Sequence, residues 1–257
     1  MKVAILAGGV GSRLIEETST KPKAMVRIGK QPILWHIMKH YSYFGFKEFI
    51  IALGYKGECI MNWMQEYSDS NRNIVVKTDS DELISHNKNA LSKADWIIRL
   101  VDTGSKTQTG GRIKRLSPWL KDQTFMLTWC DGLSDINLSA LLKFHRSHGK
   151  LATLTAVHPP TRFGHLTLEG NTVVRFKEKP KFTKDWINGA FFVLEPEVFN
   201  YIENDTTHWE SEPLERLAND RQLMAYFHTG FWQCMDTLPE KLFLERLWES
   251  GKSPWKT

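Results

Sequence analysis

Short apolar runs alternate with helical patterns along the first 157 residues. Val3–Leu6 and Phe49–Leu53 contain no polar side chain, as expected of strands that are buried on both faces. Within Pro32–Tyr43, apolar residues recur three and four positions apart, which predicts an amphipathic helix. Strands that alternate with helices indicate an α/β fold with a mostly parallel, doubly wound sheet. The same patterns predict strands at Ile97–Val101, Phe125–Thr128 and Ala152–Val157, and helices at Glu58–Tyr67 and Leu138–His148.

The pattern changes after residue 157, where three shorter apolar segments surround turns. These segments are Phe163–Leu168, Thr172–Phe176 and Gly189–Leu194. They predict either a smaller β-rich lobe or a continuation of the main sheet. Segment 77–96 is polar and rich in Asp, Ser and Asn, so we interpret it as a flap or an interface loop.

Composition narrows the class of protein. The chain has 257 residues, of which 41% are hydrophobic, and this is enough for a sizeable core. No stretch approaches the roughly 20 apolar residues of a membrane span, and the N-terminus has no hydrophobic signal region. The three cysteines lie far apart and lack the spacing of a zinc site. We therefore expect a cytoplasmic protein in a reducing compartment, with no membrane partner.

Charge adds a weak preference for anions. The net charge is +5, from 34 Lys and Arg against 29 Asp and Glu, and this favours anionic ligands. The basic clusters adjoin Gly or Pro turns and form no long basic helix. Discrete phosphate sites on loops explain them better than a nucleic-acid surface, so no nucleic-acid partner is expected.

A glycine-rich loop follows directly on the first predicted strand. Positions 8, 9 and 11 are glycines, which allow backbone N–H groups to approach phosphate oxygens. Arg13 and Lys23 add cations that suit phosphate. The loop matches neither the Walker A motif nor the dinucleotide fingerprint, and by itself it fits an ordinary strand-to-helix turn equally well. Together with the two cations it predicts a nucleoside triphosphate site at the carboxyl end of a strand.

Two aspartates are candidate ligands for a divalent metal. Asp131 follows a predicted strand and Asp236 lies much later in the chain. Their hard oxygen atoms suit Mg²⁺, while the alternative for each is a helix cap or a turn. Asp135 precedes a helical segment and is interpreted as a helix cap or a turn residue. His36 and His40 lie on a predicted helix, where surface or capping roles are favoured over metal binding.

A basic turn near residue 180 is a second candidate phosphate site. Proline at 180 restrains Lys179, whose ammonium can bind a phosphate as a point charge. Glu178 and Asn188 can hydrogen-bond sugar hydroxyls. The alternative is that the lysines of this turn are ordinary surface residues.

The motifs together resemble a known enzyme family. The loop at 8–14 with Lys-Pro nearby is similar to the signature Gly-Gly-x-Gly-(Ser/Thr)-Arg-Leu…Lys-Pro of sugar-1-phosphate nucleotidyltransferases. Longer stretches resemble the glucose-1-phosphate cytidylyltransferases along essentially the full chain. These stretches are Gly-Lys-Gln-Pro-Ile-Leu-Trp-His-Ile-Met at 29–38, Val-Asp-Thr-Gly at 101–104, Thr-Gly-Gly-Arg at 109–112 and Gly-Phe-Trp-Gln at 230–233.

The resemblance implies a fold and a reaction. The fold would be a Rossmann-like sheet flanked by helices, with a smaller sugar-binding lobe. Residues 1–257 would form one domain, in which 1–150 bind the nucleotide and 151–257 bind the sugar phosphate and support oligomerisation. The reaction would convert CTP and α-D-glucose 1-phosphate into CDP-glucose and pyrophosphate, with Mg²⁺ as cofactor. Members of the family assemble as homo-oligomers, so a trimer or hexamer is expected.

The resemblance also implies site residues. Arg13, Lys23 and Asp131 would be catalytic, and Asp131 and Asp236 would hold Mg²⁺. The nucleotide would be bound by Leu6, Ala7, Gly8, Gly9, Val10, Gly11, Ser12, Arg13, Lys23, Thr109, Gly110, Arg112 and Cys130. The sugar phosphate would be bound by Glu178, Lys179, Asn188, Gly189 and Trp232.

One position departs from the family pattern. The family usually has glycine before the metal-binding aspartate, where this chain has Cys130. A side chain there would crowd the nucleotide sugar or require a small backbone shift. Two alternatives therefore stay open: an enzyme for another nucleotide or sugar phosphate, and a non-catalytic homologue that only binds sugar nucleotides.

Overall fold

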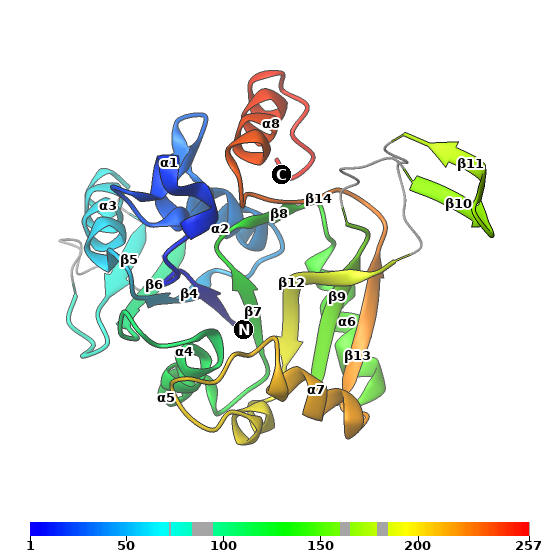
Figure 1. Cartoon of the computed structure of the whole chain (residues 1–257). Coiled ribbons are helices and arrows are strands. Elements are labelled where there is room, and N and C mark those ends of the chain that lie inside the picture. Colours follow the sequence, from blue (N-terminus) through cyan, green and yellow to red (C-terminus); the bar gives the residue numbers. More distant parts are fainter. Residues whose placement is uncertain (72, 84–94, 160–164, 179–184, 257) are drawn as a thin grey trace.

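The centre of the molecule is an eight-stranded sheet (Figure 1). The computed structural model describes residues 1–71, 73–83, 95–159, 165–178 and 185–256. Seven of these eight strands run in one direction, and β12 alone is antiparallel to both of its neighbours, β7 and β9. The order across the sheet is β13 (Leu223–His228), β9 (Ala152–Val157), β12 (Ile187–Leu194), β7 (Phe125–Trp129), β1 (Lys2–Leu6), β4 (Glu48–Leu53), β6 (Trp96–Asp102) and β5 (Ile74–Lys77). The predicted α/β fold with a mostly parallel sheet is confirmed.

Helices cover both faces of this sheet and give three layers. Alternation along β1 shows how the two cores form, because Val3 and Ile5 point to one core while Ala4 and Leu6 point to the other. The first core is closed by α2 (Ile33–Tyr43), α3 (Gly57–Ser70), α6 (Leu138–His148) and α8 (Leu238–Glu249). The second core is closed by α4 (Thr109–Arg115), α5 (Ser117–Leu120) and α7 (Glu212–Asn219).

The strongly periodic elements agree closely with the sequence. The predicted helix Leu138–His148 and the predicted strand Ala152–Val157 have the bounds that the pattern indicated. Among the longer elements, sequence reasoning missed β5, α4, α7, β13 and α8. The helix α4 contains two glycines and three basic residues, and β13 is a half-exposed edge strand, so neither carries a clear hydrophobic period.

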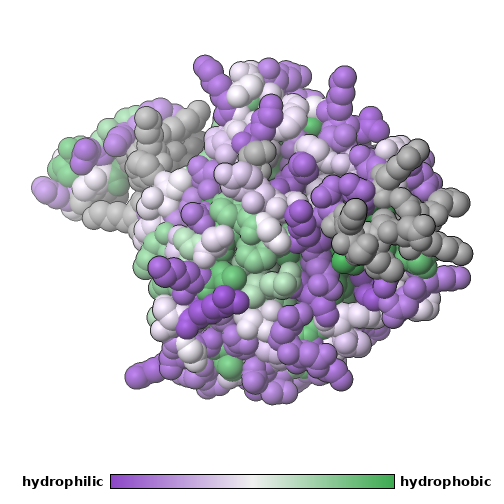
Figure 2. All heavy atoms as spheres, turned by 180° about the vertical axis from the view of Figure 1, so that it is seen from behind, coloured by the Kyte–Doolittle hydropathy of each residue, from purple (hydrophilic) through white to green (hydrophobic). Residues whose placement is uncertain are grey.

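The apolar segments after residue 157 take both expected arrangements: one continues the main sheet, and the other two form a separate β-structure. β12 joins the main sheet, while β10 (His165–Glu169) and β11 (Thr172–Lys177) form a separate antiparallel hairpin that projects from the body (Figure 1). Its surface carries exposed hydrophobic side chains, including Phe176 and Leu166 (Figure 2). A lone hairpin has little intrinsic stability in water.

Small elements complete the chain and place its C-terminal part beside its N-terminal part. β14 (Trp232–Cys234) pairs with β8 (Gly132–Ser134), the strand that follows β7. The apolar C-terminal segment packs on the molecule's own core through Leu244 and Trp255. No helix of the described residues is long and apolar enough to cross a membrane. The remaining elements are β2 (Arg27–Ile28), β3 (Gln31–Pro32), α1 (Ile15–Thr18) and the short helical turns Ser12–Leu14, Lys23–Met25 and Pro196–Tyr201.

Candidate active site

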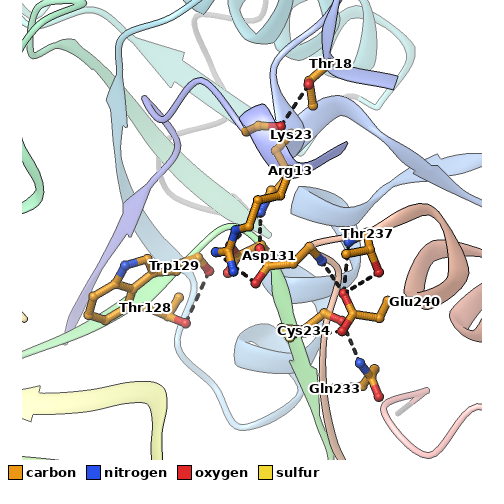
Figure 3. Close-up of polar contacts among 12 residues, drawn as sticks. Arg13, Thr18, Lys23, Thr128, Trp129, Asp131, Gln233, Cys234, Thr237 and Glu240 are labelled. Carbon is orange, nitrogen blue, oxygen red and sulfur yellow. Dashed lines mark hydrogen bonds and ion pairs between the residues drawn. The ribbon is translucent and has the colours of Figure 1, made fainter. Parts of the chain in front are cut away.

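Four charged side chains from distant parts of the chain meet beyond the end of β1 (Figure 3). The Nζ atom of Lys23 lies 3.1 Å from Asp131 Oδ2 and 2.5 Å from Asp236 Oδ1. The guanidinium of Arg13 lies 3.0 Å from the other oxygen of Asp236. The structure therefore brings together all three predicted catalytic residues and both predicted metal ligands.

The start of α8 holds Asp236 in place. Thr237 is the N-cap of this helix, and Glu240 completes a capping box. One oxygen of Glu240 accepts hydrogen bonds from the backbone N–H groups of Asp236, at 2.8 Å, and Thr237, at 2.9 Å (Figure 3). The carboxylate of Asp236 is thus presented by a rigid helix terminus.

Burial and the neighbouring charges shift the pKa values of the groups in this cluster. The Lys23 side chain is 10% exposed and that of Asp131 is 25% exposed. Burial alone would lower the pKa of Lys23, but the carboxylates of Asp131 and Asp236 raise it well above its usual value. Burial raises the pKa of Asp131, partly offset by Lys23. The two carboxylates are balanced by Lys23 and Arg13, so a bound metal ion would compete with these two side chains for the carboxylate oxygens.

A cavity of about 340 Å³ opens beside the four charged residues, within the range of roughly 300–1,000 Å³ typical of small-molecule sites. We call it the glycine-loop pocket. Ala7 packs in the core and Gly110 is buried beneath another segment. The other eleven predicted nucleotide-binding residues line the pocket: Leu6, Gly8, Gly9, Val10, Gly11, Ser12, Arg13, Lys23, Thr109, Arg112 and Cys130.

Arg112 is engaged with the backbone around the pocket. Its guanidinium donates to the carbonyl oxygens of Leu53, at 2.9 Å, Gly104, at 2.8 Å, and Gly8, at 3.0 Å. A Cβ atom built at Gly8 would lie 2.3 Å from this guanidinium. A Cβ atom at position 8 would therefore push the Arg112 guanidinium out of these hydrogen bonds, a reason for glycine that the sequence did not indicate.

Cys130 is buried between the strand end and the charged cluster. It is 7% exposed, and burial raises the pKa of its thiol to about 12, with Asp131 adding to the effect. The thiol is therefore protonated near neutral pH. A redox role would require a thiolate, and this environment opposes one.

The predicted sugar-phosphate residues are only partly brought together. Trp232 Nε1 donates to the carbonyl oxygen of Gly189 at 2.8 Å, which ties β14 to β12. Asn188 accepts a hydrogen bond from the backbone of Ala190. Glu178 follows β11 on the projecting hairpin and is exposed. Lys179 lies outside the described residues.

Two interpretations from the sequence are wrong in part. The N-cap of α6 is Asn137, whose side chain accepts from Ala140 N, whereas Asp135 accepts from the Phe231 backbone instead. His36 and His40 are buried, at 2% and 3% exposure, and do not lie on the helix surface. Both mistakes concern contacts between distant segments.

Sequence reasoning missed one wall of the glycine-loop pocket. This wall consists of residues 105–108, which follow β6, and of Trp129 at the end of β7. The available signal was their position, because the carboxyl ends of neighbouring parallel strands meet at the same edge of a sheet.

The donor set at the site fits a magnesium ion bound together with phosphate. Among the described residues, no group of three or more His, Cys, Asp or Glu side chains could hold a metal ion. Asp131 and Asp236 supply two carboxylates, and both lie around the position of the Lys23 ammonium. Mg²⁺ is commonly bound by one or two carboxylates plus substrate phosphates. Glycine loop, cations and carboxylates together suit a polyphosphate ligand.

Comparisons with known proteins agree with this geometry. A nucleotidyl transferase family model matches residues 2–237. The glucose-1-phosphate cytidylyltransferase of Salmonella typhi is 50% identical and covers 100% of this chain and 99% of its own. The probable glucose-1-phosphate cytidylyltransferase of Bacillus subtilis is 41% identical, with the same coverage. The solved structure of a UDP-glucose pyrophosphorylase with UDP-glucose shares the fold, with a TM-score of 0.69, 14% identity and coverage of 97% and 98%. The chain therefore belongs to the nucleotidyl transferase family, in the group of the glucose-1-phosphate cytidylyltransferases.

Proposed function

We propose that this protein transfers CMP from CTP to α-D-glucose 1-phosphate and releases pyrophosphate. One observation carries the proposal: Arg13, Lys23, Asp131 and Asp236 converge beside the glycine-loop pocket in a chain 50% identical to a glucose-1-phosphate cytidylyltransferase. The assignment of substrates rests on those relatives, and the assignment of roles rests on the charges at the site.

The reaction needs alignment and charge neutralisation. A sugar phosphate is mostly dianionic at neutral pH, because its second pKa is near ~6, so its oxygen attacks without a general base. That oxygen forms a bond to the α-phosphorus of CTP, and the bond to the β-phosphate oxygen breaks. Lys23 and Arg13 offset the negative charge that builds up on the α-phosphate and on the departing pyrophosphate.

Mg²⁺ is the proposed cofactor. Asp131 and Asp236 would hold it, and when bound it would neutralise phosphate charge. Lys23 would then lose its two carboxylate partners and turn its ammonium to the phosphates. The role of this side chain is thus to hold the two carboxylates together before substrate arrives.

Glu178, Lys179, Asn188, Gly189 and Trp232 are proposed to bind glucose 1-phosphate. Support comes from the link between Trp232 and Gly189, which places an indole beside the β12 backbone. Asn188 lies on the same strand, so an aromatic surface and an amide, groups that suit a sugar, are neighbours there.

A homo-oligomer, a trimer or a hexamer, is part of the proposal. It is supported by the apolar hairpin residues Phe176, Leu166 and Val173, which are 63%, 55% and 50% exposed. Apolar side chains gathered on a projecting hairpin are typical of a contact surface. Light scattering during size-exclusion chromatography measures the assembly directly, and a monomer at micromolar concentration would contradict it.

The test of function is pyrophosphate release with glucose 1-phosphate and Mg²⁺, run in parallel with CTP, UTP, dTTP, ATP and GTP. Release with CTP alone supports the proposal. Release with another nucleotide keeps the mechanism and overturns the specificity. No release with any nucleotide, together with measurable binding of CTP or CDP-glucose, would identify a non-catalytic homologue. Mannose 1-phosphate in place of glucose 1-phosphate tests the sugar.

A further inference from the structure

The helix α4, which lines the glycine-loop pocket, is held by segment 203–211. Gly110 N donates to Thr207 O at 2.9 Å, and Gln108 N donates to Asp205 O at 2.8 Å. A Cβ atom built at Gly110 would lie 2.7 Å from Thr207 O. The glycine thus permits backbone-to-backbone contact between α4 and this segment. Segment 203–211 is therefore held against α4, which forms part of the pocket lining.

Trp209 anchors the segment in the core. Its side chain is fully buried, and its backbone N–H donates to Thr109 Oγ1 at 2.9 Å. The next residue, Glu210, is exposed, yet its carboxylate makes two contacts with the pocket wall. One oxygen accepts from Thr109 Oγ1 at 2.5 Å and the other accepts from Trp129 Nε1 at 3.0 Å.

Thr109 and Trp129 belong to elements that are not consecutive in the chain. Thr109 begins α4, and Trp129 ends β7. Both line the glycine-loop pocket, and Glu210 does not. A carboxylate that accepts from both donors fixes the hydroxyl rotamer of one and the indole orientation of the other.

Trp129 lies beside the charged cluster, with its indole directed away from Asp131 (Figure 3). Arg13 and Lys23 mark the phosphate end of the pocket, and Figure 3 shows Trp129 on the side of Asp131 opposite to Thr237 and Glu240. The side chains of Thr109 and Trp129 are themselves uncharged and offer one hydroxyl and one aromatic ring, beside Lys106 of the same pocket. Those groups suit a nucleobase better than a phosphate.

We propose that Glu210 is a positioning residue for base recognition. It would act through Thr109 and Trp129, without touching the nucleotide. The proposal deepens the proposed function and rests on it for the identity of the base. It predicts that loss of the Glu210 carboxylate weakens the binding of CTP and reduces the preference of the protein for CTP over UTP. The rate of the chemical step should stay nearly unchanged.

The test compares Glu210→Gln with Glu203→Gln. Glutamine keeps the size but accepts through one oxygen only. Glu203 is exposed on the same segment, and its side chain has no hydrogen bond or ion pair to another described residue. For Glu210→Gln we expect KM and Kd for CTP to rise about tenfold, kcat to stay within about twofold, and the CTP-to-UTP ratio of kcat/KM to fall. Glu203→Gln should match the wild type.

A double-mutant cycle that combines Glu210→Gln with Trp129→Phe tests whether Glu210 acts on CTP binding through the Trp129 indole. If Glu210 acts through the indole, the two changes together weaken CTP binding less than the product of their separate effects. Equal Kd and KM values for Glu210→Gln and Glu203→Gln, with unchanged melting temperatures, would overturn the proposal. If the wild type binds CTP without turnover, the proposed function fails, while the difference in Kd between the two variants still decides the role of Glu210.

Discussion

The ammonium of Lys23 lies 2.5 Å from the carboxylate of Asp236, although 213 positions separate the two residues in the sequence. Lys23 stands on the short turn Lys23–Met25, and Asp236 stands immediately before α8. Their contact joins the two ends of the chain at the glycine-loop pocket. In the proposed reaction, binding of a substrate and a metal would reorganise this ion pair, because both would need the same groups.

Removal of Lys23 should harm both turnover and stability. Lys23→Ala removes the ion-pair partner of the partly buried Asp131, while Asp236 keeps Arg13, so we expect a loss of about 2–3 kcal/mol in the free energy of unfolding. Turnover should fall at least about 100-fold, because phosphate charge is no longer offset. Lys21→Ala is the matched control, since Lys21 forms only a partly exposed ion pair with Glu17 that contributes well under 1 kcal/mol. Urea unfolding and pyrophosphate release measure both effects.

Two neighbouring glycines should respond differently to alanine. In Gly8→Ala, the new Cβ would lie 2.3 Å from the Arg112 guanidinium, so we expect a loss of about 2–4 kcal/mol in the free energy of unfolding. Position 9 has no atom within 4 Å of the corresponding Cβ, and Gly9→Ala should change stability by less than about 0.5 kcal/mol. Chemical denaturation of the two variants tests this. Equal stabilities would show that Arg112 moves aside freely.

Acidification should destabilise the fold through buried histidines. Burial lowers the pKa of His36 to about 4, compared with about 6.5 in the unfolded chain. The unfolded chain therefore takes up the proton first, and stability is full above pH 6.5 and falls as the pH drops toward 4. For one such histidine the loss between pH 7 and pH 5 is about 2 kcal/mol. The contact with Trp255 acts in the same direction as burial, because Trp255 Nε1, 3.4 Å from His36 Nδ1, can donate only to the unprotonated ring.

Urea unfolding at pH 7 and pH 5 measures this dependence. His36→Gln should reduce the difference between the two pH values, and His208→Gln, at an exposed position, should leave it unchanged. His40, whose pKa burial also lowers to about 4, should account for a similar share. A pH dependence that is the same in His36→Gln as in the wild type would rule out this cause.

Cys130 should resist alkylation in the folded protein. Its thiol is buried, and burial raises its pKa to about 12, so the reactive thiolate is scarce at pH 7.5. Cys59 is half-buried on α3 and serves as the internal reference. Iodoacetamide labelling followed by peptide mass spectrometry should modify Cys59 first by at least about tenfold in rate. Comparable rates at the two cysteines would show that the pocket opens to the reagent.

The sequence by itself determined the alternation of strands and helices and the place of the glycine loop. Continuous apolar runs and periods of two and near 3.6 residues are local properties, so Val3–Leu6, Ala152–Val157 and Leu138–His148 can be predicted without the fold. Lys23 and Asp131 could be named because each stands near a strand end or a glycine loop. Asp236 was a candidate metal ligand by its carboxylate, and the family resemblance supplied the substrates.

The tertiary structure alone decided which distant groups meet. The pairing of β14 with β8 brings the C-terminal segment beside β7, and the positions of α4 and segment 203–211 place Arg112 and Glu210 around the pocket. No local pattern encodes such contacts, because they depend on strand order and on which face each element buries. The physical reason is that hydrophobic periodicity specifies the elements, whereas the partners of buried polar groups arise only when the layers pack together.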